Sequence, residues 1–294
     1  MQIGKYAFYE CSALSNITIP NSVIKIGPYA FSYCKSINNV IIPSSIVKIS
    51  ESLFENCLSL SNIIIPDSVI EIGPYAFSYT SIINISIPNS ITKIRNNAFY
   101  VNLLANITIP NSISSIGSNV FDKCENLTVI TIPNVIEIIG RHVLFGKNIL
   151  TGFTLPETIK VLNNNTFFEH DINTIIIPNN ITEIGEYAFS DCKTLTNIII
   201  PSSITEIGSY AFYKCISLTN IIIPNGVTKI KKFTFADCTS ISSIRLPNSL
   251  QFIETGDFYN CLFIQEVIIP YNTVIENAAF YGCNFRAPKR FSKN

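Results

Sequence analysis

The residue types that most often carry acid–base chemistry are rare in this sequence of 294 residues. It contains two histidines, His142 and His170, and Glu169 and Asp171 flank the second. These residues could be imagined as an active site within 137–171. We expect instead that imperfect turns of a repeat admit polar residues there, because no phosphate loop or nucleophile elbow accompanies them. The sequence therefore predicts no enzyme and no cofactor, with an enzyme near these residues as a remote alternative.

Cysteine is the other reactive residue type, and all nine cysteines stand three residues after a phenylalanine, at 11, 34, 57, 124, 192, 215, 238, 261 and 283. A disulfide ladder between stacked turns is one interpretation, since successive cysteines would be close enough to bond. However, consecutive runs hold three, one and five cysteines, so pairing within runs cannot be complete. We predict buried, reduced thiols that pack as small apolar residues and suit a reducing compartment. A single ladder does not converge on a metal, so no metal site is expected.

The elements that position these residues are found from the prolines. Twelve of the 15 prolines recur every 22 or 23 residues, at 20, 43, 66, 88, 110, 133, 156, 178, 201, 224, 247 and 270. Ten of them are followed eleven residues later by a phenylalanine. This periodicity predicts one solenoid over 1–285, with about 12–13 turns and an irregular centre near 135–172.

The unit 195–215 shows how one turn is expected to fold. Its alternating apolar residues predict a short strand that ends at Pro201, because proline has no N–H for the ladder. Ile204 and Ile207 begin a second extended segment, and Gly208 is expected to take a positive φ. The Tyr-Ala-Phe-x-x-Cys segment that follows is predicted to form one short 3₁₀ or α turn. A single unit cannot bury its apolar face, so the turns must stack, with their strands in a continuous parallel sheet.

The pattern Leu-x-x-Ile-x-Ile-Pro-x-Ser-Val-x-x-Ile-Gly-x-x-Ala-Phe-x-x-Cys resembles the BspA-like leucine-rich repeat family, from Ile3 to about Cys283. The resemblance implies a right-handed leucine-rich repeat solenoid of the mostly β type, with a curved parallel sheet on its concave face and 3₁₀ or helical turns on its convex side. It also implies adhesion or protein binding, often at the surface of bacteria and anaerobic protists. No secretory h-region and no apolar stretch of about 20 residues is present, so a cytoplasmic protein is expected. Surface display by non-standard export is the alternative.

Charge is sparse and unevenly placed. Charged residues make up 14% of the sequence, against about 25% in a typical soluble domain. The segment 286–294 carries four basic residues and no acid, which leaves the remainder acidic by four. Nucleic acid is therefore not an expected partner. The basic C-terminal tail is predicted to be solvated, and contact with an acidic partner or lipid is the alternative.

Two strand positions in each turn should face outward on the concave sheet, and a partner would bind there. The position two residues before each proline is mostly isoleucine, threonine or serine, and the position four residues before is mostly asparagine. A protein-contact strip is predicted, although β-branched residues could also be there for strand packing alone. The residues predicted to contact a protein partner are Ile176, Ile199 and Ile222, flanked by Asn197 and Asn220, together with Ile41, Ile64, Arg245 and Glu266.

These features predict a non-enzymatic protein-binding scaffold, with a cell-surface adhesin as the alternative. The chain opens in the middle of a repeat at Ile3 and Gly4, with no recognisable polar cap. An uncapped turn exposes apolar edges and unpaired strand groups. A homodimer formed through the N-terminal turn is therefore also predicted.

Overall fold

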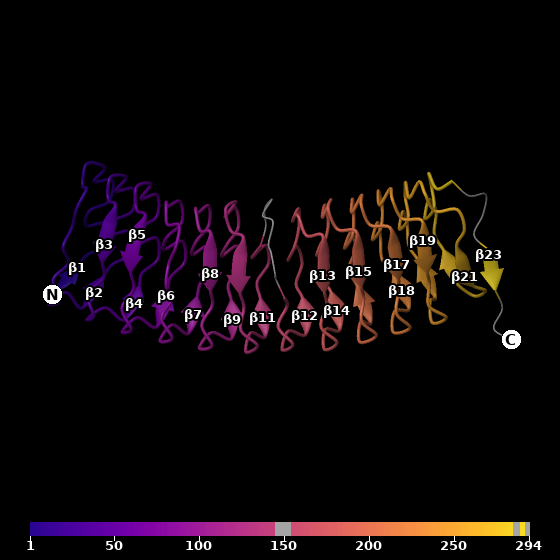
Figure 1. The fold of residues 1–294 in the computed structure, drawn as a ribbon, viewed down its shortest axis with the longest axis horizontal. Coiled ribbons are helices and arrows are strands. Elements are labelled where there is room, and N and C mark those ends of the chain that lie inside the picture. Colours follow the sequence, from indigo (N-terminus) through magenta and orange to yellow (C-terminus); the bar gives the residue numbers. More distant parts are fainter. Residues whose placement is uncertain (145–153, 285–288, 292–294) are drawn as a thin grey trace. The chain divides into compact units, whose positions relative to one another are not determined.

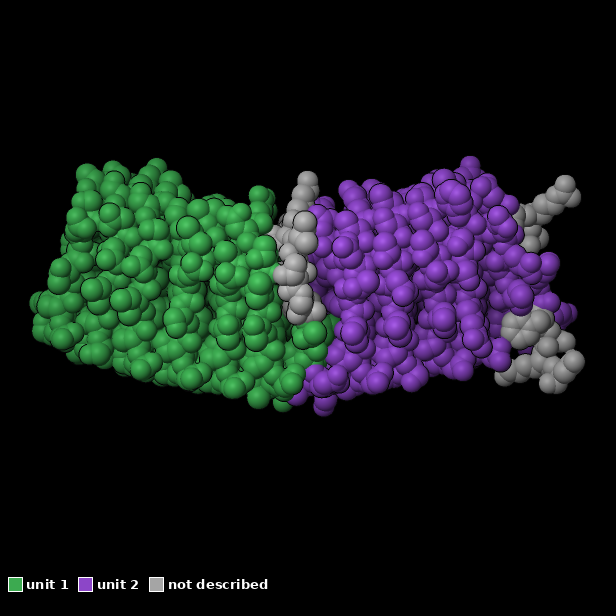
Figure 2. Space-filling model, in the orientation of Figure 1, with its two compact units in different colours: residues 1–156 green, residues 157–294 purple. Residues whose placement is uncertain are grey.

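The computed structural model describes residues 1–144, 154–284 and 289–291. Each turn of the chain contains short strands joined by hydrogen-bonded turns, and within each of two compact units successive turns stack in parallel as a solenoid (Figure 1). The chain divides into two compact units, Met1–Pro156 and Glu157–Asn294 (Figure 2). The boundary between the units lies inside the region that the sequence predicts to be irregular.

Two kinds of strand alternate along the chain. Three-residue strands precede the repeated prolines or continue their row: β3 (Asn39–Ile41), β5 (Asn62–Ile64), β8 (Asn106–Thr108), β10 (Val129–Thr131), β13 (Thr174–Ile176), β15 (Asn197–Ile199), β17 (Asn220–Ile222), β19 (Ser243–Arg245), β21 (Ile268–Pro270) and β23 (Lys289–Phe291).

Two-residue strands form the second row: β1 (Gln2–Ile3), β2 (Lys25–Ile26), β4 (Lys48–Ile49), β6 (Glu71–Ile72), β7 (Lys93–Ile94), β9 (Ser115–Ile116), β11 (Ile138–Ile139), β12 (Val161–Leu162), β14 (Glu183–Ile184), β16 (Glu206–Ile207), β18 (Lys229–Ile230), β20 (Phe252–Ile253) and β22 (Val274–Ile275).

All strand pairs in the described residues are parallel and join equivalent positions of neighbouring turns, as predicted. The pairing is interrupted, however, and the predicted continuous sheet is wrong in this respect. Between β5 and β8, the turn that contains Asn84 contributes only an isolated bridge to Asn106. The turn that contains Asn16 likewise contributes only an isolated bridge, to Asn39.

The basic tail, predicted to be solvated, forms a strand in the part that the structure describes. The residues Lys289–Phe291 form β23, which pairs in parallel with β21 in the second unit. The side chain of Arg290 donates hydrogen bonds to the carbonyl oxygens of Tyr271 and Thr273. The rest of the predicted tail lies outside the described residues.

Stacked phenylalanines fill the centre of each unit. In the first unit, rings of successive turns from Phe8 to Phe121 lie 5.1–5.9 Å apart between centroids and are within 17° of parallel. In the second unit, the ladder from Phe167 to Phe280 has spacings of 5.1–5.5 Å. Because offset stacking of buried rings is favourable, one phenylalanine per turn holds neighbouring turns in register.

The corner that carries each phenylalanine contains no α or 3₁₀ helix in the described residues, so the predicted helical turn is not found. Two residues in each such corner are left-handed, for example Tyr29 and Tyr33 with φ of 59° and 62°. The amides alternate in direction as a result. Tyr29, Phe31 and Tyr33 donate hydrogen bonds to carbonyls of the next turn, whereas Ser32 and Cys34 donate within their own turn. The alternation keeps these buried amides hydrogen-bonded.

The repeated glycine has a different role from the predicted one. Gly208 does not have a positive φ; in the described residues, only Gly256 and Gly282 are glycines of that kind. A Cβ atom on Gly208 would lie 2.5 Å from the amide nitrogen of Glu186 in the preceding turn. Glycine is therefore required there because two backbones approach closely, and the prediction of left-handed backbone was wrong.

Candidate protein-binding surface

Three exposed isoleucines form a row across neighbouring strands of the second unit. Ile176 pairs with Ile199 across β13 and β15, and β17 with Ile222 lies next to β15 (Figure 1). Their side chains are 76%, 72% and 60% exposed, whereas the isoleucine before each of them in the strand is buried. This alternation follows from the pleat of a strand, which points successive side chains to opposite faces. We refer to Ile176, Ile199 and Ile222 as the isoleucine strip.

Asparagines lie beside the strip, at the first residue of β15 and of β17. Asn197 is exposed, and the Asn220 amide donates a hydrogen bond of 3.2 Å to the Thr219 hydroxyl. No charged residue is present in β13, β15 or β17. The strip and its asparagines therefore make a neutral surface with an apolar centre and polar margins.

The predicted second group of isoleucines occupies the first unit. Ile41 and Ile64 pair across β3 and β5 and are both more than half exposed. The neighbouring turn breaks this row, since Ser86 follows at the equivalent position and does not belong to a strand. The structure thus brings the two isoleucines together as a pair, while the strip of the second unit contains three.

The two charged residues predicted for the surface lie at the C-terminal side of the strip. Arg245 pairs in register with Ile222 across β17 and β19. Glu266 is exposed, and its carboxylate lies 3.0 Å from the ammonium group of Lys289. A hollow of about 470 Å³ opens beside both residues and is also lined by Ser243, Asn248, Gln265 and others.

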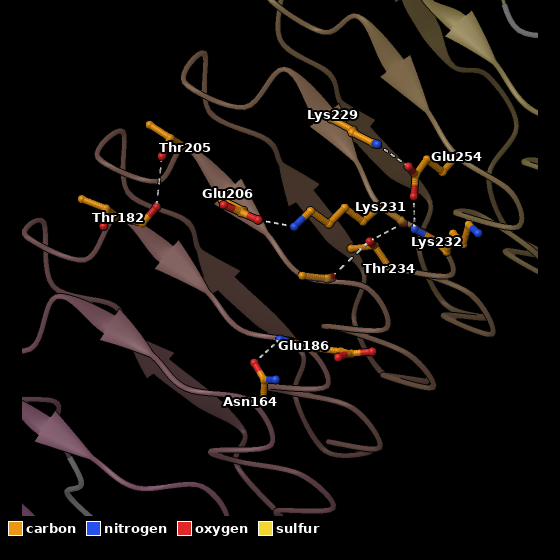
Figure 3. A network of polar contacts seen from close by, with 11 residues as sticks. Asn164, Thr182, Glu186, Thr205, Glu206, Lys229, Lys231, Lys232, Thr234 and Glu254 are labelled. Carbon is orange, nitrogen blue, oxygen red and sulfur yellow. Dashed lines mark hydrogen bonds and ion pairs between the residues drawn. The ribbon is translucent and has the colours of Figure 1, made fainter.

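Charged side chains of the two-residue strands and of the segments that follow them pair with one another in the second unit (Figure 3). Glu254 pairs with Lys229, and Glu206 pairs with Lys231 in the same unit. The hydrogen bond to Glu254 raises the pKa of Lys229 above its usual value. The hydroxyl of Thr205 donates a bond of 3.3 Å to the Thr182 carbonyl. The charged groups in these pairs are thus neutralised within the unit, unlike the guanidinium group of Arg245.

The comparison with family models identifies the repeat. A model of the BspA type leucine-rich repeat region, in six copies, matches residues 1–102, 48–172 and 160–286. The chain belongs to this family. A comparison with curated proteins found no match.

Solved structures agree with this BspA type assignment. A leucine-rich repeat protein from Bacteroides ovatus is 27% identical over 97% of this chain and 86% of its own, with a TM-score of 0.71. A leucine-rich repeat protein from Eubacterium ventriosum is 21% identical over 86% and 84%, with a TM-score of 0.56. The pneumococcal vaccine antigen PcpA is 19% identical over 87% and 72%, with a TM-score of 0.57. The last two show the likeness of fold alone.

The histidines of this BspA type chain do not form a recognisable site. His170 is fully buried, neither ring nitrogen has a hydrogen-bond partner in the described structure, and burial lowers its pKa to about 4. Burial, and then the nearby Arg141, lower the pKa of His142. No cluster of three or more metal-ligating residues occurs among the residues described. Residues 145–153 of the imagined site lie outside the described residues.

The cysteines pack as the sequence predicts. All nine are free and seven are buried, while Cys11 is exposed and Cys283 is half-buried. Burial raises the pKa of Cys34 to about 11 and that of Cys124 to about 12, which disfavours the reactive thiolate. In the part of the chain that the structure describes, no helix has the length and hydrophobicity needed to cross a bilayer.

Sequence reasoning missed the hollow and one buried acid. Ser243, Asn248 and Gln265 come from two neighbouring turns, and no local motif brings them together. Asp257 could have been noticed, because it occupies the position that is Ala188 in another turn. It is fully buried in the structure.

Proposed function

We propose that this protein is a non-enzymatic module that binds another protein through the isoleucine strip. The observation that carries the proposal is the continuous row of three isoleucines, each at least 60% exposed, on three strands that contain no charged residue. Contiguous exposed apolar patches on soluble proteins usually mark contact surfaces. The fold supplies the scaffold, and the strip supplies the contact.

Strand propensity alone does not account for these isoleucines. Thr108 and Thr131 occupy the same position in β8 and β10 and form regular strand pairs there. Threonine is also β-branched and is also enriched in strands. The strands could therefore form with hydroxyl side chains at this position, and folding does not require the exposed apolar surface of Ile176, Ile199 and Ile222.

The test replaces all three residues of the strip with threonine. This triple substitution, the threonine variant, should fold like the native protein, because threonine already occurs at the position. Immobilised native protein and threonine variant are compared for the proteins that they retain from a lysate of the producing cells. Proteins held by the native chain and lost from the variant support the proposal. Equal retention by both would contradict it.

A matched control comes from the first unit. The double variant Ile41→Thr and Ile64→Thr removes the same chemistry from an equivalent position. If the isoleucine strip is the main contact, this control should retain the proteins that the threonine variant loses. Circular dichroism and the thermal midpoint of all three proteins establish that each is folded.

The predicted homodimer also belongs to this proposal. In the first turn, the exposed ring of Tyr6 stacks on Tyr29 at 5.0 Å and meets the edge of Tyr9 at 5.4 Å. Tyr6 and Tyr9 remain 47% and 38% exposed, and this exposed aromatic surface supports self-association through that turn. Light scattering that shows a monomer at micromolar concentration would contradict it.

We propose a cytoplasmic location on the basis of the buried, unreactive thiols. A thiol count and a glycan stain on the native protein test this proposal. Nine reduced thiols without glycan support it, whereas oxidised thiols or attached glycan would favour surface display.

A further inference from the structure

At the C-terminal end of the isoleucine strip, the next residue in the row is a cation, Arg245, instead of an apolar side chain. Ile222 and Arg245 occupy equivalent positions of paired strands, and both are exposed. The hollow of about 470 Å³ begins at Arg245, where Ser243, Asn248 and Gln265 contribute hydroxyl and amide groups. A ligand that follows the strip therefore reaches a charged, hydrogen-bonding pocket at this end.

The charge of Arg245 is not compensated within the described part of the chain. Its guanidinium group makes no ion pair or hydrogen bond there, and the acid on the other side of the hollow, Glu266, is paired with Lys289 at 3.0 Å. The three groups together leave one positive charge. A guanidinium offers a planar fork of donors that matches a carboxylate, so an incoming carboxylate suits this pocket.

The spacing of the strip favours a helix as the bound element. Neighbouring strands lie about 4.8 Å apart, so Ile176 and Arg245, three strands apart, are separated by about 14 Å. A helix rises about 1.5 Å per residue, which places side chains at i, i+3 and i+7 roughly 5 Å apart and one at i+10 about 15 Å along the axis. An extended segment would repeat only every ~6.7 Å on one face. Its side chains would lose register with the strip after two strands.

We propose that the strip binds an amphipathic helix of a partner protein that carries three aliphatic side chains at i, i+3 and i+7 and a carboxylate at i+10 or i+11. The aliphatic side chains lie against Ile176, Ile199 and Ile222, and the carboxylate pairs with Arg245 at the hollow. The asparagines beside the strip face the polar flank of the helix. This assignment rests on the proposed protein-binding function and adds the chemistry of the partner.

The first experiment selects helical and linear peptides from a displayed random library on the full chain, with the threonine variant for counter-selection. Helical sequences with three aliphatic residues and an acid at the stated spacing are expected. Peptides that need the isoleucines but lack the acid, or that bind in extended form, would overturn the helix and carboxylate assignment and leave the proposed function intact. If no peptide distinguishes the native chain from the threonine variant, both proposals fail.

A charge exchange tests Arg245 directly with designed helical peptides. Fluorescence anisotropy compares a peptide with Leu at i, i+3 and i+7 and Glu at i+10 with the same peptide carrying Gln or Lys. The native chain should bind the Glu peptide about tenfold more tightly than the Gln peptide, as expected for a charge-assisted contact. Arg245→Glu should reverse the preference in favour of the Lys peptide.

Lys35→Glu is the matched control, since Lys35 is exposed, lies in the other unit and makes no ion pair within the described residues. This variant should bind all three peptides as the native chain does. Equal affinity of the native chain for the Glu, Gln and Lys peptides, or an unchanged preference in Arg245→Glu, would overturn the role of Arg245.

Discussion

Asp257 is an unfavourable residue in the core of the second unit, and replacing it should stabilise the protein. The position directly before the core phenylalanine is alanine in other turns, such as Ala188 and Ala211. Asp257 is fully buried there, and neither carboxyl oxygen has a hydrogen-bond partner in the described structure. Burial is the main cause that raises its pKa, to about 10, and approaching backbone groups of Glu254 and Thr234 offset only part of this effect.

The size of the effect follows from the two states of the carboxyl group. In the unfolded chain, an aspartic acid has a pKa of about 3.9 and is ionised at pH 7. In the folded chain, Asp257 keeps its proton up to about pH 10. Keeping the carboxyl group protonated at pH 7, roughly three pH units above its unfolded pKa, lowers the free energy of unfolding by about 4 kcal/mol, at ~1.4 kcal/mol per unit. Asp257→Ala removes this cost and a few packing contacts, so we expect the free energy of unfolding to rise by about 2–4 kcal/mol at pH 7.

The sign of the pH dependence distinguishes this explanation from simple repacking. Because the folded pKa is raised, the contribution of the protonated acid to stability is fully present below about pH 4 and is lost as the pH rises towards about 10. The advantage of Asp257→Ala should therefore grow by about 4 kcal/mol between pH 5 and pH 8. Urea unfolding followed by circular dichroism at several pH values measures this difference.

The control for this experiment is Thr234→Ala, at the same position of the preceding turn. The Thr234 hydroxyl donates a hydrogen bond of 2.6 Å to the Lys231 carbonyl, so its loss should destabilise the protein by about 1 kcal/mol without any dependence on pH. Parallel stability curves for the native chain and Asp257→Ala between pH 5 and pH 8 would refute the buried, protonated acid.

Three further predictions test the turns. Val101 is a β-branched residue in the left-handed region, with φ of 52°; Val101→Asn should raise the free energy of unfolding by about 1 kcal/mol in urea titrations, and a lower value would contradict this. Gly208→Ala would place a Cβ 2.5 Å from the Glu186 amide nitrogen, so the thermal midpoint should fall by several degrees, at a cost of about 1–3 kcal/mol. A thiol reagent on the native protein should label Cys11 first and Cys283 more slowly, and the seven buried thiols only after unfolding; rapid labelling of all nine would contradict the stacked corners.

The fold could be predicted from the sequence because its main contacts repeat. Each buried phenylalanine stacks on the phenylalanine of the next turn, so a fixed spacing in the sequence reports a fixed contact in space. The same regularity identified the exposed positions of β13, β15 and β17, since alternate residues of a strand face opposite sides. Periodic features of the molecule can therefore be predicted from the sequence alone.

Features that depend on a single turn, or on two different turns, could not be predicted in this way. The hollow at Arg245 forms where β19 is followed by a turn with Gln265 and Glu266, and no spacing rule signals that hollow. The left-handed corner residues were also missed, because tyrosine occupies such a position at Tyr29 and Tyr33 although it has no preference for it. There, the hydrogen bonds to the next turn override the local preference of the chain.

The cysteine position shows how a repeated residue can be predicted for one reason and needed for another. The sequence indicates small, buried side chains, but each thiol in the interior turns also donates to a phenylalanine carbonyl of the preceding turn, as Cys215 does to Phe189 at 3.0 Å. In a cysteine-free turn, the Asn102 amide donates to the Phe77 carbonyl at 2.9 Å. The Phe189 carbonyl also accepts the Cys192 amide at 3.2 Å, so the thiol adds a second hydrogen bond to it. Because a hydrogen bond in the core contributes about 1 kcal/mol, the position selects for a donor of the right reach as well as for small size. Cys215→Ala should therefore cost more stability than Cys215→Ser, although alanine is the less polar replacement.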